Sequence, residues 1–239
     1  MTNWYDRTEL LLGFEAIEKL KASNVLVVGV GGVGAAAAEM LIRAGIGSIT
    51  LVDGDTVQQS NCNRQLNALS STLGLSKVRV TGERLMDINP DLNLSVCPDF
   101  LEADEMEPLL SSKTWDFVVD AIDTLKPKVK LLQIAYEKKI PIVSAMGAGA
   151  KVDPSKIKQV DISKTFQCAL AKQVRRELGL LGIRNGVPVV FSTESAHKEA
   201  VVATSNEKHK RSTVGTVSYM PVLFGCHLAA YVIQKICES

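Results

Sequence analysis

The sequence predicts an α/β fold, in which a mostly parallel β-sheet has helices on both faces and is followed by a C-terminal α+β extension. Short apolar runs alternate with segments of helical period through residue 145, which is typical of parallel sheets. A glycine-rich loop follows the first of these runs. The chain has 239 residues, of which 46% are hydrophobic and 22% charged, so it can bury a large core and is not disordered.

The apolar runs and helical periods place the elements in order along the chain. Residues 9–21 have helical spacing that is interrupted by Gly13. Strands are expected at residues 25–28, 49–52, 94–97, 117–120 and 141–145. Helices are expected at residues 35–42, 77–88 and 128–138.

The pattern changes after Gly149. Polar loops, a helix that carries Lys172, Arg175 and Arg176, and a charged loop at residues 197–211 follow. We therefore expect a core of residues 1–150 and an extension of residues 151–239, both within the same structural unit.

Residues 212–234 carry no formally charged side chain and are long enough to span a bilayer. The stretch also contains Pro221 and Gly225, and its first half has a β-like composition. We expect a buried terminal helix or a subunit contact, and membrane insertion is the alternative. Because residues 1–8 are polar and charged, they do not read as a signal peptide, and a cytoplasmic protein is expected.

Charge is distributed unevenly, although the net charge is only +1. Residues 1–120 hold 9 Lys/Arg and 17 Asp/Glu, whereas residues 121–239 hold 18 and 9. The basic second half indicates a polyanionic partner. The five cysteines form no C-x-x-C pair, so no zinc is expected, and their odd number indicates reduced, intracellular thiols.

The glycine-rich loop has the pattern Gly29-x-Gly31-x-x-Gly34 between an expected strand and an expected helix. Glycines let the backbone approach a phosphate, and the helix N-terminus adds partial positive charge. Asp53 ends the second strand, where its carboxylate could accept hydrogen bonds from ribose hydroxyls. The pattern indicates a nucleotide on a Rossmann-like sheet, and a tight turn with glycines for packing alone is the alternative.

Further polar residues follow the strand ends, where ligands bind in open parallel sheets. Arg64 and Lys77 could hold the β- and γ-phosphates of ATP. Asp55 and Asp123 could bind or orient Mg²⁺. Such a set suits attack at the α-phosphate with loss of pyrophosphate, more than hydride transfer. Taken singly, each cation is more often a surface residue than a ligand, so the prediction depends on the ordered combination.

Residues 7–149 resemble the adenylating domain of the ubiquitin-activating superfamily, which includes the thiamine- and molybdopterin-biosynthesis adenylyltransferases. The strings that carry the resemblance are Arg7 ahead of Gly13, Gly29–Gly34, Asp53-Gly-Asp55, Asn61-Cys-Asn-Arg64-Gln65, Gly74-Leu-Ser-Lys77 and Asp120-Ala-Ile-Asp123. The resemblance implies that Gly32 lies against the nucleotide and that Asp53 binds its ribose. It also implies a role around the phosphates for a polar set, namely Asn61, Arg64, Gln65 and Lys77.

By the same resemblance, Asp123 serves the metal and the adenylation step, and Arg7 reaches into the ATP site of a neighbouring subunit. The implied catalytic set is Asp123, Lys77, Arg64 and Arg7, and the implied assembly is an obligate homodimer. One departure is Thr124, because asparagine usually follows the aspartate in these relatives. Because of this departure, the resemblance does not determine which groups Asp123 contacts.

The second half is similar to the tRNA threonylcarbamoyladenosine dehydratases, through strings that include Gly147-Ala-Gly149, Val152-Asp-Pro154 and Val190-Phe-Ser-Thr-Glu194. This similarity implies an enzyme that uses ATP and Mg²⁺ to activate the carboxylate of threonylcarbamoyladenosine in tRNA. The neighbouring carbamoyl group would then close a ring and expel AMP. A sulfur-relay protein is left open as a further partner, and no DNA is expected.

A tRNA substrate agrees with the basic second half. The residues expected to contact the RNA backbone are Arg175, Arg176, Lys208, Lys210 and Arg211. The alternative for each is a solvated surface cation. Three other functions stay open: adenylation of the C-terminus of a ubiquitin-like sulfur-carrier protein, nucleotide binding without turnover in a regulatory protein, and a dehydrogenase.

Overall fold

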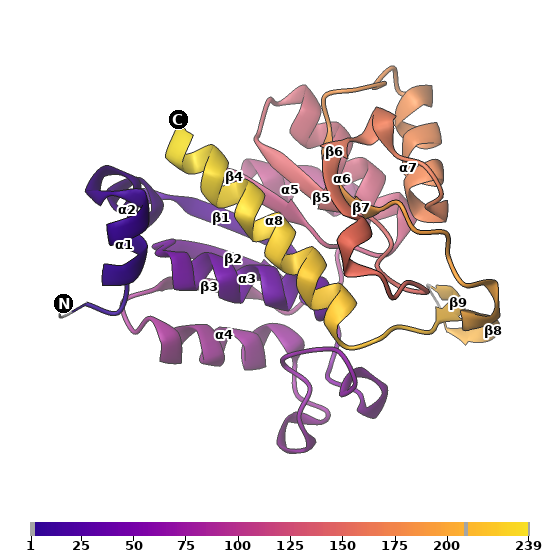
Figure 1. Ribbon diagram of the computed structural model, residues 1–239, viewed down its shortest axis with the longest axis horizontal. Helices are drawn as coiled ribbons and strands as arrows, with labels where there is room; N and C mark the ends of the chain where they lie inside the picture. The colour runs from indigo at the N-terminus through magenta and orange to yellow at the C-terminus, as the bar shows by residue number, and fades with distance from the viewer. Residues whose placement is uncertain (1–2, 208–209, 239) are drawn as a thin grey trace.

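A computed structural model describes residues 3–207 and 210–238 of the chain (Figure 1). Its centre is a seven-stranded sheet with the order β3-β2-β1-β4-β5-β7-β6. The strands are β1 (Asn24–Val28), β2 (Ser48–Val52), β3 (Asn93–Cys97), β4 (Phe117–Asp120), β5 (Ile142–Ala145), β6 (Ile157–Asp161) and β7 (Pro188–Ser192). All neighbouring strands run parallel except β6, which pairs antiparallel with β7.

Helices cover both faces of this sheet, so the predicted fold class is confirmed. One face carries α2 (Phe14–Ala22), α3 (Gly32–Ala44), α4 (Lys77–Ile88) and α8 (Tyr219–Glu238). The other face carries α5 (Met106–Ser111), α6 (Leu125–Glu137) and α7 (Ala169–Leu180). Helix α1 (Asp6–Leu12) precedes α2 and is separated from it at Gly13, as the interrupted periodicity predicted. Short 3-10 turns lie at Gln59–Asn61, Ser70–Thr72, Ala103–Glu105, Pro154–Lys156, Ile162–Lys164 and Lys198–Ala200.

The two-sided burial explains why the central strands read as unbroken apolar runs. In β1, Val25 and Val27 belong to the core beneath α3 and α8, whereas Leu26 and Val28 belong to the core beneath α6. Side chains alternate across a strand, and a strand buried on both faces therefore has no polar face.

Helix α8 is 20 residues long and apolar enough to cross a membrane by length and composition. It instead lies along α3 in the fold (Figure 1), with Phe224, Leu228 and Val232 fully buried. A Cβ atom at Gly225 would lie 2.5 Å from the carbonyl oxygen of Val33 in α3, so the two helices cross in close contact. The expectation of a terminal helix packed in the core is confirmed for this segment.

One segment differs from the prediction. The expected charged loop at residues 197–211 contains most of an antiparallel hairpin, β8 (Val201–Glu207) and β9 (Lys210–Val214). The hairpin forms its own two-stranded sheet, apart from the main one. The sequences of the two strands show no clear alternation of apolar and polar residues, which is the pattern that reveals a half-buried strand. Strands β6 and β7 lie beyond residue 150 in sequence and complete the main sheet. The division of the chain into a core of residues 1–150 and an extension of residues 151–239 stays a prediction.

Candidate functional site

The glycine loop lies at the carboxyl edge of the sheet, between β1 and the start of α3. Gly29 has φ of +88°, and a Cβ atom there would be 2.7 Å from the carbonyl oxygen of Ala121. A Cβ atom at Gly34 would be 1.7 Å from the carbonyl oxygen of Gly29. Both positions therefore need glycine for the loop to close. Gly31 caps α3, and the helix N-terminus points its free N–H groups into this edge.

Asp53 holds the glycine loop in place. Its carboxylate accepts hydrogen bonds from the backbone N–H groups of Val30, at 2.6 Å, and Asp55, at 2.8 Å. Burial raises the pKa of Asp53, against the opposing effects of the Lys77 charge and the two N–H donors. The loop and the second strand end are thus fixed to each other at the position predicted for the ribose.

Lys77 and Asp55 form an ion pair, with 2.7 Å between Nζ and Oδ2. The Lys77 side chain is only 6% exposed, whereas that of Asp55 is 52% exposed. The backbone N–H of Lys77 also donates to the carbonyl of Asp55, at 3.0 Å. The first residue of α4 is therefore tied twice to the end of β2, and its ammonium lies at the edge where the glycine loop begins.

The segment from Asn61 to Gln65 closes the site from the side. The Arg64 guanidinium donates to the carbonyl of Ser60, at 2.8 Å, and to Oδ1 of Asn63, at 2.7 Å. The Asn61 side chain is buried and accepts from the N–H of Gln58, which shapes this turn.

Two features at this edge test whether a nucleotide would fit. A Cβ atom at Gly32 would lie 3.1 Å from the Arg64 carbonyl oxygen and 3.0 Å from Pro221, so the backbone here is packed closely between these two segments. The buried Oε1 atom of Gln65 has no hydrogen-bond partner within the described residues. Narrow backbone space, a buried cation and an unpaired acceptor suit a ligand that brings phosphate oxygens and a hydrogen-bond donor.

The two aspartates that follow β4 have different surroundings. Asp123 is exposed in the loop that leads into α6. Asp120 is fully buried, and its Oδ2 atom accepts from Lys128, at 2.5 Å, and from Ser144, at 2.6 Å. Lys128 stands at the start of the helix expected at residues 128–138, and its pairing with Asp120 was not predicted, because the charge of a residue does not reveal whether it is solvated. Lys128 therefore lies in the core and not on the basic surface.

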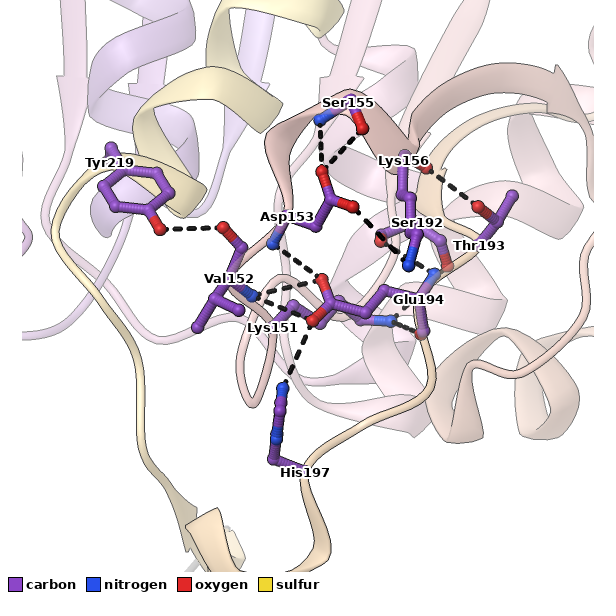
Figure 2. A network of polar contacts seen from close by, with 10 residues as sticks. All are labelled: Lys151, Val152, Asp153, Ser155, Lys156, Ser192, Thr193, Glu194, His197 and Tyr219. Atoms are coloured by element: carbon purple, nitrogen blue, oxygen red, sulfur yellow. Dashed lines mark hydrogen bonds and ion pairs between the residues drawn. The ribbon is translucent and has the colours of Figure 1, made fainter.

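A second polar network lies next to the site, at the carboxyl ends of β5 and β7 (Figure 2). The Glu194 carboxylate accepts from the N–H groups of Val152 and Asp153 and lies 3.3 Å from Nε2 of His197. Burial alone would raise the pKa of Glu194, but these donors outweigh it and the pKa is lowered. Lys151 is buried and donates to the carbonyl of Glu194, at 2.9 Å, and burial lowers its pKa.

The whole chain is similar to one known protein family. The family model described as the ThiF family matches residues 5–239. The chain belongs to the ThiF family. The predicted resemblance to the adenylating superfamily is thereby confirmed over nearly the whole length.

Two similar proteins narrow the branch of the ThiF family. The chain is 44% identical to the tRNA threonylcarbamoyladenosine dehydratase of Bacillus subtilis, over 100% of this chain and 96% of the relative. It matches the crystal structure of the Escherichia coli tRNA N6-threonylcarbamoyladenosine dehydratase in complex with ATP with a TM-score of 0.88 at 35% identity, covering 98% of this chain and 93% of that one. The molybdopterin-synthase adenylyltransferase of Escherichia coli is 36% identical, but over only 62% of this chain.

Arg7 lies outside the site of its own ThiF subunit. It is exposed on α1, and α1 lies beside α2 at the end of the sheet where β1 begins (Figure 1). None of residues 6–12 is buried, and three neighbouring apolar side chains are mostly exposed: Leu10, Leu11 and Phe14. The structure therefore does not bring Arg7 to Lys77 and Arg64 within one chain.

The residues predicted for RNA differ in how they are presented. Arg176 is 77% exposed and lies 3.2 Å from a Glu177 carboxylate oxygen. The Arg175 guanidinium is partly buried and donates to the Thr165 carbonyl, at 2.8 Å, and to its hydroxyl. Lys208 lies outside the described residues. Lys210 and Arg211 belong to β9, but their side chains are outside what the structure describes.

Two other features of this ThiF chain lie apart from the nucleotide edge. A pocket of about 790 Å³ opens at the amino edge of the sheet, and the described residues that line it include Lys19, Tyr136 and Tyr231 but no residue predicted for the nucleotide. Within residues 3–207 and 210–238, no three His, Cys, Asp or Glu side chains come together as a metal-binding group. The absence of zinc stays a prediction.

Proposed function

We propose that this chain binds ATP and catalyses the dehydration of threonylcarbamoyladenosine in tRNA, by adenylating its carboxylate and releasing AMP after ring closure. The observation that carries the proposal is the full-length similarity to dehydratases, in a chain whose glycine loop, Lys77 and Arg64 gather at one sheet edge. Adenylation of a sulfur-carrier protein has weaker support, because the molybdopterin-synthase adenylyltransferase match covers only 62% of the chain.

In the proposed reaction, a carboxylate oxygen of the substrate bonds to the α-phosphorus of ATP, and the bond to pyrophosphate breaks. The carbamoyl group then attacks the activated acyl carbon, AMP leaves, and a ring forms with net loss of water. Lys77 and Arg64 stabilise the phosphate charge, while Gly29, Gly31, Gly32 and Gly34 leave room for the nucleotide. Asn61 and Gln65 complete this set, and Asp53 is assigned to the ribose. Asp55 and Asp123 would hold Mg²⁺, which would neutralise charge on the phosphates.

The proposed function predicts a defined change in tRNA. Incubation with ATP and tRNA that carries threonylcarbamoyladenosine is expected to lower the mass of that nucleoside by one water molecule and to release AMP in equal amount. Mass analysis of the digested tRNA measures the first change, and AMP chromatography the second. An unchanged nucleoside, together with ATP–pyrophosphate exchange on a small protein that ends in Gly-Gly, would favour sulfur-carrier adenylation instead.

A homodimer in which Arg7 completes the partner subunit's ATP site is part of the proposal. Two observations support it. Helix α1, which carries Arg7, lies at the end of the sheet where β1 begins (Figure 1), whereas Lys77 is tied to the end of β2. Apolar side chains next to Arg7 in sequence are also solvent-exposed, including Leu11 at 82% and Phe14 at 65%. Large exposed apolar patches are typical of subunit contacts. The long helix α8 would then belong to a cytoplasmic enzyme and not to a membrane anchor.

Mixing two inactive variants is expected to restore activity if Arg7 acts across the dimer. Arg7→Ala and Lys77→Ala each lack one half of a shared site, and a mixed dimer rebuilds one intact site from the two wild-type halves. After denaturation and refolding together, statistical exchange should return about a quarter of wild-type turnover. AMP release measures it, and refolding each variant alone is the control. Turnover that stays at the level of the separate variants would exclude a shared site.

We further propose that residues 151–239 provide the tRNA-facing surface and residues 1–150 the ATP-binding core. The support is the surplus of cations in the second half and the exposed Arg176, with Arg175, Lys208, Lys210 and Arg211 assigned to the same footprint. No DNA target is proposed, and a sulfur-relay protein stays a further candidate partner.

Binding of tRNA is expected to weaken steeply with salt, because cations that contact phosphates release counterions. For a footprint of this kind, the affinity should fall by about a thousandfold between 50 and 200 mM salt. Filter binding at several salt concentrations gives the slope, and Arg176→Ala should make it shallower by about one unit. Lys130→Ala, on a helix outside the proposed footprint, is the matched control. A flat salt profile in the wild-type chain would contradict the basic surface.

A further inference from the structure

Asn63 joins two parts of the chain that are far apart in sequence. Its side-chain Nδ2 donates to the carbonyl oxygen of Thr216, at 2.9 Å, and its Oδ1 accepts from the guanidinium of Arg64, at 2.7 Å. One amide group therefore connects the proposed phosphate-binding arginine with the chain that leaves the β8–β9 hairpin. The function described above gives Asn63 no role.

The residues on the far side of this connection form the base of the hairpin. Strand β9 ends at Val214, and Gly215 follows, with its N–H donating to the carbonyl of Ala200 at 2.7 Å. The Gly215 carbonyl in turn accepts from Ala150, at 2.8 Å. Both strands of the hairpin are thus held together at the point where Thr216 meets Asn63.

The same segment also lies against the nucleotide cradle. Beyond Thr216 the chain enters α8, where Pro221 would be 3.0 Å from a Cβ atom at Gly32. The Arg64 carbonyl oxygen lies 3.1 Å from the same point. A shift at the base of the hairpin therefore has a short, continuous path of contacts to Arg64 and to the glycine loop.

We propose that Asn63 is a positioning residue that couples the hairpin to Arg64, so that tRNA on the hairpin sets the arginine for ATP. The inference rests on the proposed function, since it takes tRNA as the ligand of the hairpin. By thermodynamic linkage, tRNA and ATP then strengthen each other's binding by the same factor. An enzyme built in this way binds ATP tightly only when its RNA substrate is present.

The chemistry of the amide offers a selective variant. Asn63→Asp keeps an oxygen acceptor for Arg64 but replaces the donor to Thr216 by a second acceptor, which faces a carbonyl oxygen. Asn63→Ala removes both contacts. Asn93→Asp makes the same chemical change at the start of β3, which is at the amino edge of the sheet and away from the nucleotide edge. Among the hydrogen bonds described, the side-chain amide of Asn93 contacts only Ser48. Because Asn63 is exposed, none of these variants is expected to lower the thermal midpoint by more than a few degrees.

The test measures the affinity for the non-cleavable analogue α,β-methylene-ATP with and without saturating tRNA that carries threonylcarbamoyladenosine. In the wild-type chain and in Asn93→Asp, tRNA is expected to tighten analogue binding about tenfold. In Asn63→Asp and Asn63→Ala the ratio should fall to about one, while each variant still binds tRNA. A structural role alone would change single affinities or the thermal midpoint but would leave the ratio intact.

Two results would overturn the inference. One is a wild-type ratio near one, and the other is an Asn63→Asp variant that keeps the wild-type ratio. The nucleoside mass assay on the wild-type chain separates this failure from failure of the proposed function. If the wild-type chain dehydrates the nucleoside but either of these two results is found, only the role of Asn63 is rejected. If the wild-type chain does not dehydrate the nucleoside, the proposed function and the inference are rejected together.

Discussion

Replacing Lys77 by alanine is expected to lower AMP formation at least about a hundredfold while the protein stays folded. The ammonium of Lys77 is the most buried cation at the nucleotide edge among the site residues described, with its side chain 6% exposed. A buried charge acts on a phosphate through little solvent, so its removal has a large effect on a charged transition state. Single-turnover release of AMP with saturating ATP measures the loss.

The expected stability of this variant follows from the ion pair. Removing Lys77 leaves Asp55 without its partner, but the Asp55 side chain is 52% exposed and water can solvate it. The thermal midpoint should therefore fall by several degrees, about what the loss of a buried aliphatic stem explains. Lys235→Ala, which removes an exposed lysine at the end of α8, is the control. Turnover that is unchanged in Lys77→Ala would show that Lys77 does not belong to the site.

The parts of the fold that the sequence predicted well have local causes. The strand at residues 117–120 and the helix at residues 77–88 have the predicted bounds, because a fully buried strand is an apolar run and Pro90 ends the helix. The glycine loop was equally predictable from the sequence, since Gly29 and Gly34 are required by neighbouring backbone atoms.

The parts that were missed depend on contacts between distant segments. The β8–β9 hairpin was predicted as a loop, because the sequences of its two strands show no clear alternation of apolar and polar residues. Lys151 and Glu194 are 43 residues apart, and no pattern in either segment reveals that they meet. Asn63 is similar: its neighbour Arg64 was predicted from a motif, whereas Thr216 reaches Asn63 only through the return of the chain from the hairpin.

Lys128 gives the sharpest contrast between sequence and structure, and its replacement by methionine is expected to reduce the free energy of unfolding by about 3–5 kcal/mol. Lys128 and Asp120 have side chains that are 0% exposed, so the variant leaves a carboxylate buried without its cation. Ser144 donates one hydrogen bond to that carboxylate but cannot neutralise it. Urea unfolding, with the slope of the transition compared between variants, measures the change.

A second substitution separates loss of the pair from loss of the lysine side chain. Asp120→Asn in the Lys128→Met background removes the stranded charge, and an amide of similar volume can still bond to Ser144, so most of the stability should return. If Lys128 instead contacted RNA at the surface, Lys128→Met alone would leave unfolding unchanged and reduce the salt slope of tRNA binding. The buried pair also lies directly before the loop that carries Asp123, since Asp120 accepts from the N–H of Ile122 at 3.0 Å. The stabilised double variant therefore shows whether this loop needs the ion pair for AMP formation or only a folded strand end.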